Sequence, residues 1–315
     1  MTLPDEGIIG VFGVRSSDSL EALPQDRVEV IARHAPDYIH FKALGVDVST
    51  KPKSDYALAI VVLPRSKDEA RHLIAVAAER TKGRVIVDGQ KTDGVDSILK
   101  ELARHAVVLD TFSKSHGKLA VAEDLSCTEW LTTGDALIEG RFHTAPGVFS
   151  ADGVDPGSLL LANTLPQNLK GRVADLGAGW GYLSDAILTR PEVIGLDLVE
   201  ADYDALEMAR KNIADPRARF HWADARDFLP ESPLDHVVMN PPFHTGRRPD
   251  ASLGQAFIRQ SAAMLKSKGS LWLVANRHLP YETVLQDAFA ETKVLDETPS
   301  YKLFHATSPR RHRKG

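Results

Sequence analysis

One segment constrains this chain more than any other, because in it a short apolar strand runs directly into three alternate glycines. The segment reads VADLGAGWGY and covers residues 173–182, so the strand ends in Asp175 and the glycines are Gly177, Gly179 and Gly181. Glycine lacks a Cβ atom and adopts positive φ, which lets a ligand lie against the backbone where a helix begins. The segment therefore predicts an α/β unit with a ligand site at this turn.

The spacing of the glycines narrows the choice of ligand. A dinucleotide fingerprint has the spacing Gly-x-Gly-x-x-Gly, which seats a pyrophosphate, whereas this chain has Asp-x-Gly-x-Gly-x-Gly. A carboxylate in front of the turn repels a pyrophosphate but suits the ammonium group of an amino acid. The pattern therefore argues against a nicotinamide-dependent oxidoreductase.

Two further acids follow the next two predicted strands. Glu200 ends the strand over 193–200, where a carboxylate can bind a ribose diol. Asp197 competes for this role, but it is separated from Glu200 by an odd number of residues and faces the other side of the strand. Asp224 follows the third strand and can accept a hydrogen bond from the exocyclic amine of adenine. Together these acids predict a nucleoside site.

The fourth strand leads into a stiff loop, Asn240, Pro241, Pro242, Phe243 and His244. The prolines fix φ, and such a loop at the carboxyl end of a strand is where a doubly wound sheet places its chemistry. The side-chain carbonyl of Asn240 and a backbone carbonyl of Asn240 or Pro241 can bind both hydrogens of a planar amino group. Phe243 offers a face for stacking an aromatic base, and His244 could accept a proton, contact phosphate or only shape the loop.

The length of 315 residues allows two domains, and the composition of 43% hydrophobic and 26% charged residues is that of a globular protein. Strands alternate with helices in both halves, which predicts mostly parallel sheets covered on both faces. We expect one domain over 1–125, a linker over 126–145 and a second domain over 146–315. In the first half, strands are predicted over 8–14, 57–63, 85–87 and 106–109, and helices over 68–80 and 96–104. In the second half, strands are predicted over 172–176, 193–199, 219–222, 235–239 and 270–275, helices over 182–189, 204–213, 255–265 and 282–289, and a hairpin over 292–295 and 302–306.

Charge and cysteine content limit the function classes. The net charge of −5 argues weakly against nucleic acid as a partner, since proteins that bind it usually show a basic surface. A single cysteine, Cys127, excludes an intrachain disulfide and a cysteine-based zinc cluster. The sequence shows no apolar run long enough for a membrane span and no signal peptide, so we expect a cytoplasmic protein with no membrane contact. We also expect a monomer.

Residues 175–181 with Glu200 and Asp224 resemble the S-adenosylmethionine site of class I methyltransferases, whose seven-stranded sheet has a reversed last strand. The Asn-Pro-Pro-Phe loop resembles that of enzymes that methylate adenine N6, guanine N2 or glutamine N5. The resemblance implies S-adenosylmethionine as cofactor, S-adenosylhomocysteine as product and no metal, with residues 240–243 as the catalytic loop. We further assign Ala225, Phe149 and Asn240 to the cofactor site.

The flanking segments are similar to those of bacterial ribosomal RNA guanine-N2 methyltransferases, most of all the small-subunit type. They are residues 146–161, 240–244 and 275–282 and, in the first half, 63–70 and 87–95. This resemblance implies ribosomal RNA or the small ribosomal subunit as partner. It also implies that the first half is a degenerate methyltransferase-like domain, without cofactor, that supports folding and RNA binding. Trp180 departs from the family, which has a small or aliphatic residue there, and it either packs on the helix or narrows the site.

Other functions stay open at this point. A glutamine-N5 protein methyltransferase or an adenine-N6 methyltransferase would share the catalytic loop, although glutamine enzymes tend to begin with a small helical domain. A non-catalytic RNA-binding or ribosome assembly protein could keep the fold, but it would have no need for the intact glycines and Asn240.

Overall fold

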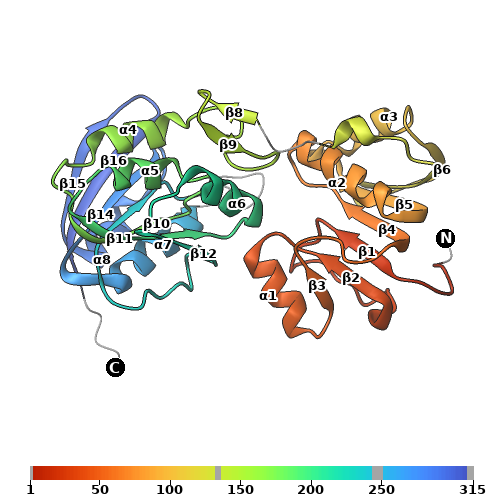
Figure 1. The fold of residues 1–315 in the computed structure, drawn as a ribbon, viewed down its shortest axis with the longest axis horizontal. Coiled ribbons are helices and arrows are strands. Elements are labelled where there is room, and N and C mark those ends of the chain that lie inside the picture. Colours follow the sequence, from red (N-terminus) through yellow and green to blue (C-terminus); the bar gives the residue numbers. More distant parts are fainter. Residues whose placement is uncertain (1–2, 132–135, 243–250, 311–315) are drawn as a thin grey trace. The chain divides into compact units, whose positions relative to one another are not determined.

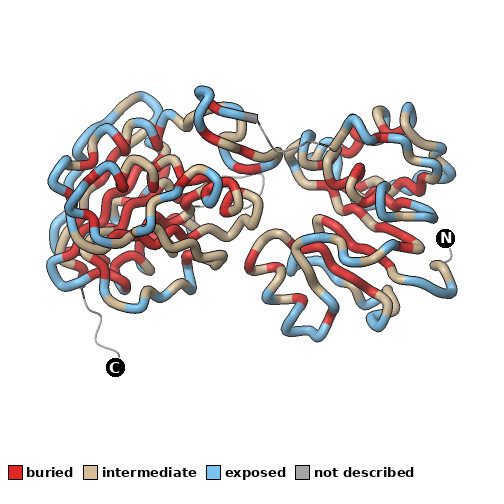
Figure 2. The backbone as a smooth tube through the Cα atoms, in the orientation of Figure 1, coloured by how far each residue is buried: buried red, intermediate tan, exposed pale blue. Residues whose placement is uncertain are grey.

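A computed structural model describes residues 3–131, 136–242 and 251–310 of the chain (Figure 1). The chain forms two compact units. Unit 1 comprises Met1–Asp135 and Ala145–Gly147, and unit 2 comprises Ala136–Thr144 and Val148–Gly315. In each unit the strands are mostly buried and the loops are exposed (Figure 2).

Unit 1 is built on a seven-stranded sheet in the order β3-β2-β1-β4-β5-β7-β6. All neighbours are parallel except the pairs that β7 makes with β5 and β6. Its strands are β1 (Ile9–Phe12), β2 (Val28–Ile31), β3 (Asp47–Ser49), β4 (Tyr56–Val62), β5 (Thr81–Gln90), β6 (Val107–Lys114) and β7 (Gly117–Glu123). Its helices are α1 (Ala35–Ala43), α2 (Lys67–Glu79) and α3 (Val95–Leu102), with short 3-10 turns η1 (Gln25–Arg27), η2 (Lys91–Asp93) and η3 (Thr128–Trp130).

Unit 2 repeats this topology, with the order β12-β11-β10-β13-β14-β16-β15 and with β16 antiparallel to both of its neighbours. Its strands are β10 (Gly171–Leu176), β11 (Val193–Glu200), β12 (Ala218–Trp222), β13 (Leu234–Met239), β14 (Leu265–Asn276), β15 (Phe289–Glu297) and β16 (Tyr301–Pro309). Its helices are α4 (Pro156–Thr164), α5 (Tyr182–Leu188), α6 (Tyr203–Asn212), α7 (Ala251–Met264) and α8 (Glu282–Ala288), and β8 (Ala136–Ile138) pairs with β9 (Phe142–Thr144). The prediction of two α/β domains, the second with a seven-stranded sheet that contains one reversed strand near its end, agrees with this architecture.

The sheet of unit 2 buries both faces because successive side chains on a strand point in opposite directions. On β10, Val173 packs with helices α4, α5 and α6, whereas Ala174 and Leu176 pack with α7 and α8. The two apolar layers hold the sheet between helices. The carboxyl ends of β10, β11 and β13, where the sequence predicts the site, are therefore fixed by a core on either side.

The structure corrects the sequence analysis in unit 1, where the predicted elements omit β2, β3, β7 and α1; in unit 2 they omit α4. Strands β2 and β3 have only four and three residues, too few to show a period of two. The expected linker, 126–145, contains regular structure: η3 lies in unit 1, and the β8–β9 hairpin lies in unit 2. In the described part of the chain, no helix is long and apolar enough to cross a membrane.

Candidate active site

The glycine turn joins β10 to α5, and all three of its glycines have positive φ: +73° at Gly177, +55° at Gly179 and +94° at Gly181. A Cβ atom on Gly179 would have no described atom within 4 Å, and one on Gly177 would only touch Phe257 and Pro242 at 3.6 and 3.8 Å. A Cβ on Gly181 would lie 2.8 Å from Ile213 Cδ1. Gly179 therefore has open space beside the backbone, Gly177 has only ordinary contacts, and Gly181 allows α5 to pack closely on the end of α6.

Glu200, at the end of β11, holds the turn in place. Its Oε2 accepts a hydrogen bond from the Gly179 N–H at 2.8 Å, and its Oε1 accepts one from the Asp202 N–H at 2.8 Å. Burial raises the pKa of the Glu200 carboxyl. Each carboxylate oxygen has a second lone pair, so Glu200 can accept further bonds from a ligand hydroxyl.

Asp197, the competing acid on β11, lies in a different environment. Its carboxylate accepts hydrogen bonds from His221 at 2.9 Å and from Arg219 at 3.2 Å, and it lies 3.7 Å from the Arg172 guanidinium. Burial alone would raise the pKa of the Asp197 carboxyl, but these three partners together outweigh it and lower that pKa. The structure thus places Glu200, and not Asp197, beside the glycine turn.

Asp175, at the end of β10, is fully buried. Its Oδ2 accepts a hydrogen bond from Ser184 Oγ at 2.7 Å, while Oδ1 has no hydrogen-bond partner among the described residues. Burial raises the pKa of this carboxyl to about 7, which the bond from Ser184 only partly offsets. A buried acceptor without a partner is costly, and an ammonium group that reached Oδ1 would satisfy it.

The structure places the remaining predicted cofactor residues in different settings. Asp224 accepts hydrogen bonds from the Arg226 N–H at 2.8 Å and from its Nε at 2.9 and 3.0 Å, so its carboxylate is engaged by a guanidinium. Ala225 is buried in the core against α7 and α8. Phe149 is 57% exposed, and its carbonyl accepts a hydrogen bond from Trp180 Nε1 at 3.1 Å.

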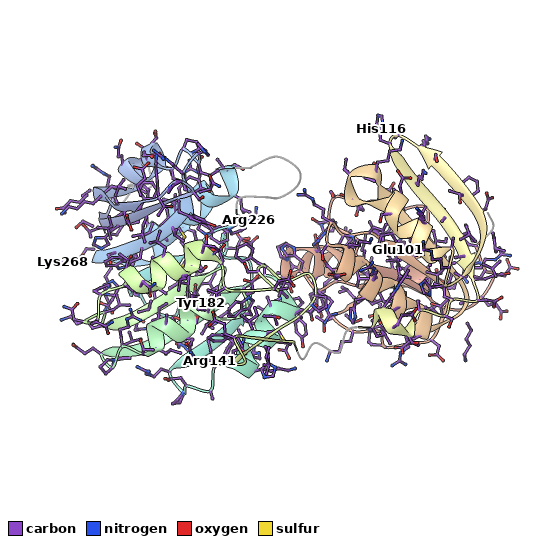
Figure 3. The ribbon with its side chains drawn as sticks, turned by 90° about the horizontal axis from the view of Figure 1, so that it is seen from above. Glu101, His116, Arg141, Tyr182, Arg226 and Lys268 are labelled. Atoms are coloured by element: carbon purple, nitrogen blue, oxygen red, sulfur yellow. The ribbon has the colours of Figure 1, made fainter. Side chains whose placement is uncertain are left out.

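Trp180, the unusual residue inside the turn, is buried. Its indole packs against Phe142 of β9 and Tyr182 of α5, with ring centroids 5.2 and 5.7 Å apart; Tyr182 is labelled in Figure 3. The Asn212 amide on α6 donates to the backbone carbonyls of Trp180 and His143, at 2.8 and 2.9 Å. The large side chain therefore packs onto α5 and β9, and the space beside Gly179 stays open.

Asn240 follows β13, the neighbour of β10, and Met239 pairs with Leu176 in the sheet. Its Nδ2 donates to Asp155 Oδ2 at 2.8 Å and to Ser158 Oγ at 2.9 Å. Both amide hydrogens are thus bound on the side of α4, and the residue follows the strand next to the one that leads into the glycine turn. Pro241 is buried and Pro242 is exposed.

Phe243 and His244 lie outside the described residues. Asp155 and Ser158 are site residues that the sequence analysis did not single out. Their signal was present in Asp-Pro-Gly-Ser at 155–158, a typical helix start in which Asp155 caps α4 by accepting a bond from the Ser158 N–H at 2.8 Å. Within the described ranges, no group of three or more His, Cys, Asp or Glu side chains is placed to hold a metal ion.

Comparison with known proteins agrees with this geometry. The sequence profile of the family described as "Methyltransferase small domain" matches residues 139–305. Ribosomal RNA small subunit methyltransferase C of Salmonella newport is 30% identical over 295 residues, which cover 91% of this chain and 85% of that protein. The chain belongs to this methyltransferase family. The protein of the same name from Psychromonas ingrahamii is 30% identical over 266 residues, covering 80% of this chain and 76% of that protein.

A solved structure is similar to the present chain over both of its units. The 16S rRNA N2 methyltransferase of T. thermophilus, determined in complex with AdoMet and guanosine, matches with a TM-score of 0.80 and 26% sequence identity. The match covers 98% of this chain and 90% of that one. The family predicted from the glycine turn and the Asn-Pro-Pro-Phe loop is therefore confirmed, and so is the pairing of two methyltransferase-type domains in one chain.

Proposed function

We propose that this protein transfers the methyl group of S-adenosylmethionine to the exocyclic N2 amine of a guanine in small-subunit ribosomal RNA. One observation supports this most: the open glycine turn and the Asn240 amide oxygen lie at the ends of adjacent strands, β10 and β13. A methyl donor held at the first and an amine held at the second would be neighbours. The relatives named above are ribosomal RNA methyltransferases, and the T. thermophilus enzyme acts on N2 of guanine 1207.

The residues around the turn fit the parts of S-adenosylmethionine. Gly179 leaves open space beside the turn, and Asp175 Oδ1, which has no hydrogen-bond partner among the described residues, suits an ammonium group. Glu200 has lone pairs for a ribose diol. The Asp224 carboxylate, which Arg226 engages, can accept a bond from the adenine amine only through its remaining acceptor capacity. Phe149 offers an exposed side chain as contact surface, whereas Ala225 is buried in the core and can only support the loop that carries Asp224.

The chemistry asked of the protein is positioning. When bound, S-adenosylmethionine supplies an electrophilic methyl group on a sulfonium. The N2 lone pair of guanine is delocalised into the ring, so the amine is a poor nucleophile. Asn240 Oδ1 and a backbone carbonyl of residue 240 or 241 accept the two amine hydrogens and thereby turn the lone pair toward the methyl group. The N–C bond forms as the S–C bond breaks, and the amine proton leaves afterwards to water. In this proposal Phe243 stacks on the base.

The proposal also covers the role of unit 1, the substrate and the oligomeric state. We assign to unit 1 the support of folding and the binding of RNA, and to unit 2 the catalysis. Because the net charge is −5, RNA contact rests on local lysines and arginines rather than on overall charge. The substrate is ribosomal RNA or the small ribosomal subunit, and the protein acts as a monomer in the cytoplasm.

The test is incubation of the purified protein with labelled S-adenosylmethionine and ribosomal subunits from cells that lack the gene, followed by nucleoside analysis. Label in N2-methylguanosine of the small-subunit RNA is the expected result. Label in N6-methyladenosine or in protein glutamine would replace guanine by one of the alternative acceptors. Absence of transfer to RNA and protein, with S-adenosylmethionine still bound, would favour a binding or assembly role.

A further inference from the structure

We propose that Asp155 is a positioning residue for methyl transfer: it holds the Asn240 side-chain amide in the one orientation that presents Oδ1 to the substrate amine. Asp155 stands at the N-terminus of α4, 85 residues before Asn240 in the chain, yet its Oδ2 accepts a hydrogen bond from Asn240 Nδ2 at 2.8 Å. This inference rests on the proposed function, because it concerns the same acceptor.

The contacts of Asn240 leave its amide no choice of orientation. Both hydrogens of Nδ2 are used, one by Asp155 Oδ2 at 2.8 Å and one by Ser158 Oγ at 2.9 Å. An ionised carboxylate can only accept hydrogen bonds, so the group that faces it must be the NH₂ group. A flipped amide would set its own oxygen against the carboxylate and lose that bond, whereas the Ser158 hydroxyl, which can donate or accept, could serve either orientation; Asp155 therefore decides the orientation. The Oδ1 atom must therefore point away from α4.

The carboxylate of Asp155 is itself held by the start of its own helix and lies beside β16. Its Oδ2 accepts the Ser158 N–H at 2.8 Å as the helix cap. Burial, and after it the nearby Asp155 carboxylate, raises the pKa of the Tyr301 hydroxyl at the start of β16. Space for Tyr301 depends on Gly157, where a Cβ atom would lie 2.8 Å from Tyr301 Cε1 and 3.0 Å from Asp155 Oδ2. Three elements, α4, the loop after β13 and β16, thus meet at one carboxylate.

The consequence concerns the rate of transfer more than binding of either substrate. If the Asn240 amide sampled two orientations, its carbonyl oxygen would face the substrate amine only part of the time. In the other orientation its NH₂ group would face the N–H groups of the amine, and no hydrogen bond could form. Fixing the amide in advance avoids this loss in the transition state. The cofactor turn is formed by other residues, so substitution of Asp155 should leave the affinity for S-adenosylmethionine nearly unchanged.

Two substitutions separate positioning from helix capping. Asp155→Ser keeps a good N-cap residue, but its shorter side chain cannot serve both Ser158 and Asn240. We expect kcat to fall about 10- to 100-fold, the range for one charge-assisted hydrogen bond, with the Kd for S-adenosylmethionine within about threefold. Asp155→Asn keeps an oxygen that can accept both bonds, so it should retain kcat within about fivefold. Ser66→Ala, which removes the cap of α2 in unit 1, should leave kcat unchanged.

A spectroscopic readout keeps the inference falsifiable. The ¹H–¹⁵N signals of the Asn240 side-chain amide, assigned by their loss in Asn240→Ala, should shift upfield in Asp155→Ser and stay in place in Asp155→Asn. Normal kcat in Asp155→Ser, or equal loss in both Asp155 variants with both folded, would overturn the positioning role. If Asn240→Ala also methylated guanine normally, the proposed function of Asn240 would fail first. If Asn240→Ala were inactive and Asp155→Ser normal, only this inference would fail.

Discussion

Units 1 and 2 have the same strand order, yet they differ at the positions that would hold a ligand. Strand register sets the equivalence, because Phe12 pairs with Ile31 and Val61 in unit 1 as Leu176 pairs with Val199 and Met239 in unit 2. By this register, apolar residues of unit 1 replace the three polar strand-end residues of unit 2. The pairs are Val11 for Asp175, Ala32 for Glu200 and Val62 for Asn240.

The first glycine of the turn shows the same contrast in backbone terms. Gly13 follows β1 with φ +70°, and Gly177 follows β10 with φ +73°. A Cβ atom on Gly13 would lie 2.3 Å from the Val62 carbonyl oxygen, whereas one on Gly177 would meet only ordinary contacts. In unit 1 the glycine allows the backbone to close on β4; in unit 2 the backbone at the same position does not close on β13. One topology therefore supports either a packed turn or an open one.

Among substitutions that test this difference between the two units, the largest loss of activity is expected at Asn240. Replacing it by alanine removes the acceptor for the substrate amine, so methyl transfer should fall about 100- to 1,000-fold, the range for losing one oxyanion-type contact. The Kd for S-adenosylmethionine should stay within a few fold. Single-turnover assays and calorimetry measure the two quantities. Val62→Ala at the equivalent position of unit 1 is the control and should leave turnover intact; retained turnover in Asn240→Ala would refute the role.

The next effect concerns the open turn. Gly179→Ala places a methyl group in the space beside the turn and should weaken S-adenosylmethionine binding by about 30-fold, beside a stability cost of about 1–2 kcal/mol for the positive φ. Gly94→Ala in unit 1 is the matched control, because Gly94 also has positive φ, at +78°, and open space around its Cβ position. Calorimetric titration and thermal unfolding should show equal destabilisation but weaker binding only for Gly179→Ala. Equal binding in both variants would contradict a ligand at this turn.

A third prediction uses pH, because unit 1 has valine where unit 2 has Asp175. Burial raises the pKa of Asp175 from 3.8 to about 7. If its ionised form receives the cofactor ammonium, affinity should rise with pH from 5.5 to 7, by at most about tenfold per unit. Asp175→Asn should bind with a flat profile over this range, and a parallel rise in both proteins would assign the effect elsewhere.

The Asp175 carboxyl also makes the stability of the ligand-free protein depend on pH, but in the direction opposite to cofactor affinity. An acid whose pKa is raised in the folded state binds its proton more tightly when folded than when unfolded. The ligand-free protein therefore keeps this contribution to stability below the usual pKa of 3.8 and loses it as the pH rises to about 7. Denaturant unfolding of the wild-type protein and Asp175→Asn across that range should show the difference.

The smallest effect is expected at the hydroxyl that supports this carboxylate. Ser184→Ala removes the bond to Asp175 Oδ2 and should cost about 1–3 kcal/mol in the free energy of unfolding. It should also move the rise in cofactor affinity to higher pH, because the ionised form loses a donor. Thr189→Ala, at the exposed end of the same helix, is the control. An unchanged pH profile in Ser184→Ala would show that this bond does not tune Asp175.

Sequence analysis predicted those parts of the fold that are determined by residues close together in the chain. The glycine turn, the long strands and the amphipathic helices of unit 2 follow from periodicity and from turn residues. The three-residue strand β3 and the four-residue β2 did not, because the pairing of β2 with β1 and of β3 with β2 supplies the order that so short a segment lacks.

The same limit applies to the site. Glu200 could be preferred over Asp197 because strand alternation is local. The pairing of Asp155 with Asn240 could not be foreseen, since the two side chains are brought together by the packing of α4 against the sheet. Arg226 and Asp224 are only two residues apart in the sequence. Their ion pair could still not be predicted, because the loop conformation determines which nearby acid the arginine binds.

Trp180 gives this enzyme a built-in optical probe. Its indole is buried within the glycine turn and donates its N–H to the carbonyl of Phe149, a residue whose own side chain is exposed. Indole emission depends on the hydrogen bonding and polarity around the ring, so a ligand that moves either neighbour changes the fluorescence. We expect occupancy of the turn to change the emission of this one of the four tryptophans, without a label and without turnover.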